Sequence, residues 1–310
     1  MATIKNIQAP AFTRADVIAY SRDYYQLTKP KVVALLVLTA WVGMMLATPA
    51  PPNFLLMLAA SVGIALVSAA AAAFNHVLDQ KIDAQMARTH MRPLPKGRLT
   101  TLQAVGFACA LAISGFVLLL FAVNTLTAVL TLFGLFGYAV VYTLLLKRAT
   151  PQNIVIGGLA GALPPVLGWT AITGSLSGEA LLLMMIVFTW TPPHFWALAI
   201  HRCKDYAKAN IPMLPVTHGI EFTKTAILLY TLLLLVVCLL PYLVGMTGIL
   251  YLIASLYLNA KFIHHAWRLK FKAEANTAMD TFRFSIVHLM VLFLVLLVDH
   301  YAKWNFDTFF

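Results

Sequence analysis

Long apolar runs alternate with short polar connections along almost the whole chain. The runs are about 20 residues long, which is the length of helix that crosses a hydrocarbon core about 30 Å thick. The ten-residue alternation typical of a membrane β-barrel is not seen. We therefore predict an all-α, polytopic membrane protein with about nine transmembrane helices. The expected spans are residues 31–48, 53–74, 101–121, 124–146, 152–172, 179–201, 222–245, 247–267 and 282–302.

The composition agrees with this pattern. Hydrophobic residues make up 61% of the chain and charged residues 11%, whereas an ordinary soluble domain carries about 25% charged residues. Residues 1–30 include Asp16 and Asp23 and lack an apolar core, so they do not have the pattern of a cleavable signal peptide. We expect 1–30 to be a cytoplasmic tail, 31–302 the membrane domain, and 303–310 a short tail.

The positive charges are distributed very unevenly. The net charge is +11, and all but one of the 22 Lys and Arg residues fall in alternate connections, with Lys303 as the exception. The positive-inside rule places these connections in the cytoplasm, with the amino terminus inside and the carboxyl terminus outside. The excess charge thus sets topology in a lipid bilayer, and we expect no nucleic-acid partner.

Polar residues recur every fourth position where the second span ends. Asn75, Asp79 and Asp83 follow a run rich in alanine, and this spacing puts them on one helix face. Two carboxylates stacked at the mouth of an apolar span are costly unless a cation neutralises them. The stripe therefore predicts a cation site.

Several cations follow these carboxylates in the connection 75–100. Mg²⁺ prefers one or two carboxylates together with phosphate oxygens, and arginine can hold further phosphate oxygens in bidentate geometry. We therefore expect a magnesium ion bridged to a phosphate-rich substrate; an ordinary basic loop with two incidental aspartates is the alternative. The cations are Arg88, His90, Arg92, Lys96 and Arg98.

A second candidate loop, 202–221, follows the sixth span. Asp205 lies there with Arg202, Lys204 and Lys208 around it, an arrangement that could hold a second magnesium and its phosphate ligand. Asp205 alone is a weak signal, but its loop faces the same side as 75–100. We therefore predict two related halves around a central cavity that opens to the cytoplasm.

Three residues near span ends allow two interpretations each. Tyr142 could present its ring to a developing carbocation or belong to an interfacial belt with Lys147. The helical rise places His194 at a depth of about 12 Å in the membrane. It could be a functional group there, or it could only form a hydrogen bond to a neighbouring helix. For Lys29, before the first span, a basic anchor at the headgroups is favoured over a substrate contact.

Over nearly all of residues 25–300 the chain resembles the intramembrane prenyltransferases of the UbiA superfamily. The resemblance depends on particular strings, and the last three of them are more typical of the members that act on haem than of those in quinone pathways. The strings are 27–31, the Asn75/Asp79/Asp83 motif with 88–95, and then 147–158, 190–200 and 205–215.

The resemblance implies transfer of farnesyl from farnesyl diphosphate to a vinyl group of haem B, with addition of water, at a Mg²⁺ site. It implies that Asn75, Asp79, Asp83 and Asp205 coordinate the metal-diphosphate, with the three aspartates as metal ligands. Arg88, Arg92, Lys147 and Lys204 would contact the diphosphate, Tyr142 would serve the reaction, and His194 would orient or ligate the haem.

Two positions depart from the superfamily pattern. His76 stands where many members have aspartate, and Asp205 stands alone where many have two or more, so cations would do part of the work of a second magnesium. The resemblance also implies the bacterial inner membrane, with haem A synthase or terminal oxidase assembly downstream. A prenyltransferase for aromatic or quinone precursors and a membrane haem carrier remain alternatives.

Overall fold

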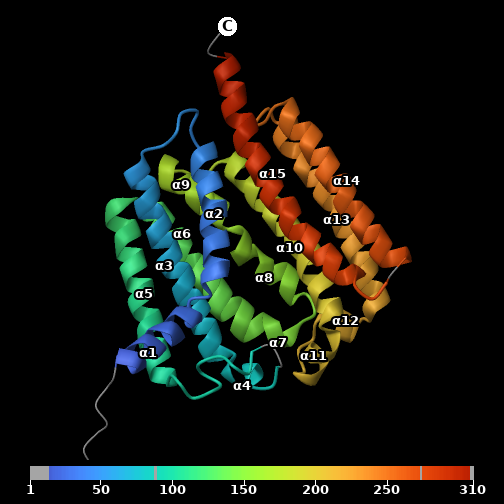
Figure 1. Ribbon diagram of the computed structural model, residues 1–310. Coiled ribbons are helices and arrows are strands. Elements are labelled where there is room, and N and C mark those ends of the chain that lie inside the picture. Colours follow the sequence, from blue (N-terminus) through green and yellow to red (C-terminus); the bar gives the residue numbers. More distant parts are fainter. Residues whose placement is uncertain (1–13, 87–88, 273, 308–310) are drawn as a thin grey trace, which may run out of the picture.

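The computed structural model describes residues 14–86, 89–272 and 274–307, and within these ranges every regular element is a helix (Figure 1). The all-helical prediction is therefore confirmed. The α-helices are α1 (Arg14–Leu27), α2 (Pro30–Leu46), α3 (Phe54–Leu78), α4 (Gln80–Asp83), α5 (Thr101–Ala122), α6 (Thr125–Phe136), α7 (Lys147–Ala149), α8 (Asn153–Ala162), α9 (Pro164–Thr173), α10 (Gly178–His201), α11 (Cys203–Lys208), α12 (Leu214–Thr217), α13 (Ile220–Leu243), α14 (Ile249–Phe271) and α15 (Thr277–Asp307), and a π-helix, η1 (Gly137–Leu146), continues α6.

Seven helical segments in the described ranges are long and apolar enough to cross a membrane. An eighth is counted if α1 and α2, which meet at a bend of 49°, form one broken span. The remaining predicted span corresponds to α14, whose polar residues include Asn259, Lys261 and His264. The chain is thus built for the membrane, while the exact number of nine spans stays a prediction. Residues 14–27, which the sequence predicts to be part of the cytoplasmic tail, form helix α1.

Polar side chains mark where the long helices begin. Asn53 Oδ1 accepts a hydrogen bond from the Leu55 N–H at 2.9 Å at the start of α3. Thr100 and Gln103 form a capping box at the start of α5. Such caps satisfy backbone N–H groups that have no partner within the helix. They place the helix starts in the polar connections, as the pattern of apolar runs predicts.

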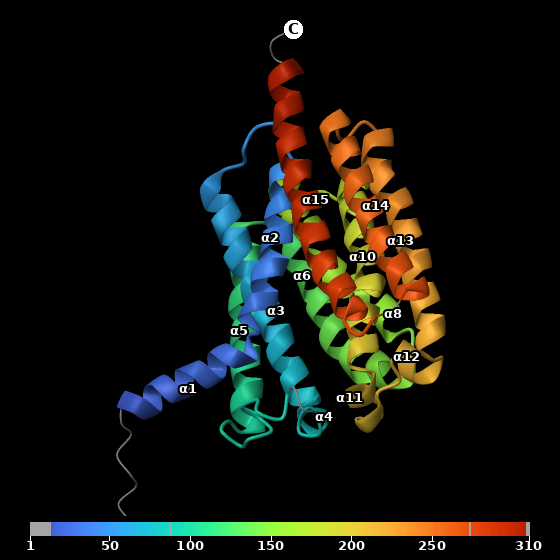
Figure 2. The ribbon, with the colours of Figure 1, turned by 45° about the vertical axis from the view of Figure 1, so that its right-hand side comes forward.

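The two candidate loops lie at the same end of the bundle. In both views α4, which follows α3, and α11, which follows α10, occupy the lower end together with α1, while the carboxyl-terminal end of α15 lies at the top (Figures 1 and 2). Helix α3 packs against α2 and α5, and α10 packs against α8, α13 and α15. The fold therefore brings the segments after the second and sixth predicted spans to one end.

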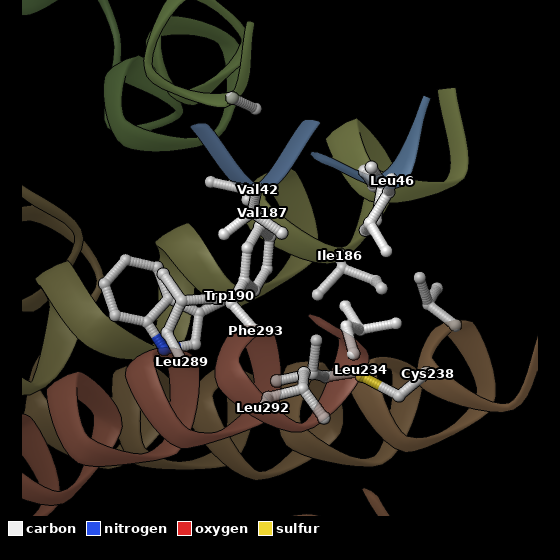
Figure 3. Packing of buried hydrophobic residues seen from close by; sticks show 14 of the residues in the cluster. Val42, Leu46, Ile186, Val187, Trp190, Leu234, Cys238, Leu289, Leu292 and Phe293 are labelled. Carbon is white, nitrogen blue, oxygen red and sulfur yellow. The ribbon is translucent and has the colours of Figure 1, made fainter. Parts of the chain in front are cut away.

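A large apolar cluster holds α10, α13, α14 and α15 together and reaches α2 (Figure 3). Trp190 and Ile186 of α10, Leu234 of α13, and Leu292 and Phe293 of α15 belong to it, and all five are buried. Because lipid is as apolar as these side chains, their contribution inside a membrane comes mainly from close packing.

Helices α2 and α9 approach each other closely at two glycines. A Cβ atom at Gly43 would overlap the carbonyl of Pro165, and one at Gly168 would overlap the carbonyl of Ala40. Small residues at helix crossings allow backbones to pack directly in membranes. This reciprocal contact fixes α2, which follows Lys29, against the rest of the bundle.

We expect Gly168→Ala to lower the midpoint of thermal unfolding in detergent, because the new methyl group would overlap the Ala40 carbonyl. Overpacking of this kind costs about 1–3 kcal/mol. Gly161→Ala is the matched control, since nothing lies within 4 Å of a Cβ atom there, and alanine should be neutral or slightly stabilising. Equal midpoints for Gly168→Ala and the wild type, measured by scanning fluorimetry, would contradict the assignment of this crossing.

Candidate active site

Asp79 is the centre of a buried polar cluster at the end of α3. Its Oδ2 accepts hydrogen bonds from Asn75 Nδ2 at 2.8 Å and from Lys147 Nζ at 2.5 Å. Asn75 and Asp79 are 3% and 1% exposed. The Asp79 N–H donates to the Asn75 carbonyl at 2.9 Å and the Asp83 N–H to the Asp79 carbonyl at 2.8 Å. Helical bonding therefore continues across the break between α3 and α4.

Asp83 is paired with a cation from the same loop. Arg92 Nη1 donates to Asp83 Oδ2 at 2.6 Å, and the Thr89 hydroxyl donates to the Asp83 carbonyl at 3.0 Å. The loop thus folds back over α4 and brings Arg92 to the Asp83 carboxylate. Arg88, another predicted diphosphate contact, lies outside the described residues.

Lys29 reaches into the cluster from the bend between α1 and α2. Its Nζ donates to Asn75 Oδ1 at 2.5 Å and lies 3.5 Å from the Tyr138 hydroxyl. Its backbone is left-handed, with φ 48° and ψ 58°, a conformation that costs a non-glycine residue about 1–3 kcal/mol and is often found at functional sites. Lys29, for which the sequence favoured an anchor at the headgroups, therefore contacts the candidate site residue Asn75.

The π-helix η1 supplies the opposite wall of the cluster. Thr143 Oγ1 donates to the Tyr138 carbonyl at 2.8 Å and accepts from Asn75 Nδ2 at 3.1 Å. Tyr142 stacks on Tyr138 with ring centroids 5.6 Å apart. Segments of π-helix are frequent at functional sites. Here the wider turn precedes Lys147, whose Nζ reaches Asp79.

Asp205 lies by a different part of the first loop. Its carboxylate pairs with Arg202 at 3.4 Å, and its side chain is 26% exposed. It lines a cavity of about 230 Å³ together with Met86, His90 and Lys208, so the two loops do meet. The side chain of Lys204, the neighbouring predicted phosphate contact, is exposed.

The cluster offers oxygen ligands of the kind that magnesium prefers. In the described part of the chain, no three His, Cys, Asp or Glu side chains lie close enough to hold a metal together. Asp79 Oδ1, however, is buried without a hydrogen-bond partner, and carboxylate and amide oxygens are normal Mg²⁺ ligands. The residues therefore fit a divalent ion on Asp79, while Lys147 and Arg92 hold the Oδ2 atoms of Asp79 and Asp83.

Cations exceed carboxylates within this cluster. Lys29, Lys147 and Arg92 bring three positive charges, and Asp79 and Asp83 bring two negative charges. Charges interact more strongly in such a buried place than in water. The excess suits an anionic ligand, and even more so one that arrives with its own divalent cation to occupy the carboxylates.

His194 lies on α10, in an aromatic setting shared with α15. Its ring stacks on Trp190 at 4.3 Å and on Phe282 at 4.5 Å between ring centroids. Its Nδ1 is 2.6 Å from the Ser285 hydroxyl. The hydrogen bond to a neighbouring helix, one of the two interpretations of this buried histidine, is thus present.

Two contacts of the cluster could not be found from the sequence pattern, and for a third, Lys29, the pattern favoured a membrane anchor. Tyr138 and Thr143 are five residues apart, and this spacing has meaning only in a π-helix. Lys29 has the pattern of any basic residue before a span. Its neighbour Pro30, at the first helical position of α2, was the one local sign that the backbone is fixed there.

A family profile and curated relatives match most of the chain. The profile of the UbiA prenyltransferase family matches residues 36–296. The chain is 62% identical to protoheme IX farnesyltransferase 2 of Pseudoalteromonas atlantica (strain T6c), over 92% of this chain and 93% of that protein. It is 60% identical to protoheme IX farnesyltransferase of Colwellia psychrerythraea (strain 34H), over 97% and 98% of the two chains.

Solved structures share the fold at low sequence identity. A structure of digeranylgeranylglyceryl phosphate synthase has a TM-score of 0.77 with 20% identity, covering 91% of this chain and 98% of that one. A UbiA homologue from Archaeoglobus fulgidus bound to DMAPP and Mg²⁺ has a TM-score of 0.59 with 16% identity, covering 88% and 99%. From the family profile and the relatives at about 60% identity, we conclude that this integral membrane protein belongs to the UbiA prenyltransferase family.

Proposed function

We propose that the protein transfers the farnesyl group of farnesyl diphosphate to a vinyl group of protohaem IX, with addition of water, giving haem O and diphosphate. The observation that carries this proposal is the identity of about 60%, over more than nine-tenths of the chain, to relatives named protoheme IX farnesyltransferase. The polar cluster around Asp79 supplies the chemistry that the donor substrate needs.

The diphosphate binds at the cluster of Lys29, Arg92 and Lys147. These side chains stabilise the charge that develops on the diphosphate when the bond from farnesyl C1 to oxygen breaks and the electron pair leaves with oxygen. Asp79 and Asp83 would hold Mg²⁺, which would neutralise further charge on the leaving diphosphate. Lys204 and Asp205, from the second loop, would add contacts to the metal-diphosphate, and so would Arg88, which lies outside the described residues.

The acceptor reacts on the membrane side of this cluster. A haem vinyl carbon forms the new bond to farnesyl C1, and water adds to the other vinyl carbon and loses a proton, leaving a hydroxyethylfarnesyl group. The ring face of Tyr142 stabilises positive charge on the allylic carbon. Early entry of water would quench this charge, so the reaction needs a closed apolar chamber, which the small residues of α3 and α8 would line.

His194 binds the haem iron through Nε2 in this proposal. The Ser285 hydroxyl donates its one hydrogen to the Phe282 carbonyl at 2.6 Å. It therefore accepts a hydrogen bond from His194 Nδ1–H, and this tautomer keeps a lone pair on Nε2. A hydrogen bond on one ring nitrogen is the usual way in which a protein orients a metal-binding histidine.

In this proposal the protein lies in the inner membrane of a bacterial cell, and its active site faces the cytoplasm. Support comes from the basic connections, which the positive-inside rule assigns to that side, and from the common end of the bundle at which α4 and α11 lie (Figure 1). Haem A synthase or the assembly of a terminal oxidase would take the product.

The function is tested with purified protein in detergent, haem B and farnesyl diphosphate, with product measured by mass spectrometry. We expect a haem heavier by one farnesyl group plus water, formed with Mg²⁺ and lost when a chelator is added. Unchanged haem with diphosphate release on a phenolic acceptor would instead identify an aromatic prenyltransferase. Haem binding with no product from any acceptor would favour a haem carrier.

A further inference from the structure

His76 is a buried histidine whose ring has no hydrogen-bond partner. The residue is 2% exposed, and among the described residues neither Nδ1 nor Nε2 makes a hydrogen bond. Buried polar groups in native proteins are nearly always satisfied, and a histidine that served packing alone would cost free energy in this state. Both ring nitrogens are therefore available to a ligand that binds at the end of α3.

The ring belongs to the same helical turn as the central carboxylate of the cluster. His76 is three residues before Asp79 in sequence, and residues at this spacing are neighbours on one side of a helix. Asp79 Oδ1 is likewise buried without a hydrogen-bond partner. A carboxylate and an imidazole three residues apart on an inward helix face bind metal in several helical bundles; there the carboxylate comes first, whereas here His76 precedes Asp79.

The three cations of the cluster lie near enough to His76 to act on its ring electrostatically. The charges of Lys29, Arg92 and Lys147 all act on the His76 ring, and these cations hold Asn75, Asp83 and Asp79 respectively. His76 therefore lies near the polar cluster, and its 2% exposure shields it from the lipid. In its neutral form the ring offers one N–H donor and one lone pair to whatever binds there.

We propose that His76 is a ligand, beside Asp79 Oδ1, of the divalent cation that accompanies the diphosphate. This inference rests on the proposed function and adds a residue to its metal site. A mixed set of imidazole nitrogen and carboxylate oxygen binds Mn²⁺, Co²⁺ or Zn²⁺ better than a set of oxygen ligands alone, relative to Mg²⁺. The protein should therefore bind Mn²⁺ more tightly than Mg²⁺.

The test is pulsed electron paramagnetic resonance of Mn²⁺ bound to the full chain in detergent with inorganic diphosphate. We expect a ¹⁴N coupling from a directly bound imidazole in the wild type, its loss in His76→Gln, and Mn²⁺ affinity at least about tenfold weaker in that variant. His300→Gln is the matched control, because Nε2 of His300 bonds to the Thr48 carbonyl at 3.1 Å near the opposite end of the bundle. The control should keep the coupling.

A second variant tests the same assignment without removing the ligand. His76→Asp should keep Mn²⁺ binding, lose the nitrogen coupling and shift the ratio of affinities towards Mg²⁺. A coupling that persists in His76→Gln, or bound Mn²⁺ without nitrogen coupling in the wild type, would overturn the inference. Parallel mass spectrometry of the haem product separates the two proposals. Farnesylated haem without a nitrogen coupling would support the proposed function and refute His76 as a metal ligand. A nitrogen coupling without a haem product would support the metal ligand and refute haem as the acceptor.

Discussion

Asp79→Ala is expected to abolish haem farnesylation, with a fall in turnover of about 10³-fold or more. In the proposed function Asp79 holds the metal, and loss of a single group that stabilises transition-state charge already costs about 10²–10³-fold. The Asp79 carboxylate also accepts hydrogen bonds from Asn75 and Lys147, so its loss disturbs the position of both side chains. Turnover by mass spectrometry, at saturating farnesyl diphosphate, measures the effect; Asp83→Ala should behave similarly.

Removal of a buried charge can also harm folding, since it leaves Lys147 without its partner. Asp79→Asn therefore accompanies the alanine variant, because it keeps the side-chain shape and removes the charge. The control is Asp280→Ala, whose carboxylate is 45% exposed and pairs loosely with Arg283 at 3.9 Å. Asp79→Asn and Asp83→Ala proteins that insert, elute as the wild type does and still turn over normally would refute the metal assignment.

The helical membrane architecture follows from the sequence because each span carries its own signal. A run of about 20 apolar residues is sufficient to predict a spanning helix, and caps such as Asn53 lie in the polar gaps between runs. The two weak cases show the limit of this signal. Helix α2 has 17 residues and gains length from α1 across the bend at Lys29, and α14 carries polar groups such as Asn259 that are buried between helices.

The candidate site could be predicted where it follows one helix and not where it depends on packing between helices. The recurrence of Asn75, Asp79 and Asp83 is visible in the sequence because helical periodicity brings these side chains together locally. The contacts of Lys29 and Thr143 with Asn75 join residues 46 and 68 positions away. No periodic pattern connects such distant positions, since tertiary packing and a π-helix create the contact.

Lys147→Met is expected to change two affinities in opposite directions. Without substrate, Lys147 neutralises Asp79, so its removal should free the carboxylate and tighten Mn²⁺ binding. With substrate, the same ammonium contacts the diphosphate in the proposed function, and a charged hydrogen bond of this type contributes about 1.5–3 kcal/mol. Farnesyl diphosphate should therefore bind about 10–100-fold more weakly. Calorimetry in detergent measures both affinities.

The opposite signs make this prediction robust against a folding defect, because a damaged site would bind both ligands more weakly. Lys224→Met is the matched control: Lys224 bonds to Glu221 at 2.7 Å at the start of α13, outside the polar cluster, so neither affinity should change. Weaker Mn²⁺ binding in a well-folded Lys147→Met protein would contradict competition between the lysine and the metal for Asp79. Lys147 on Oδ2 and a divalent ion on Oδ1 would share one buried carboxylate, so each cation weakens the binding of the other until the diphosphate brings further negative charge to the site.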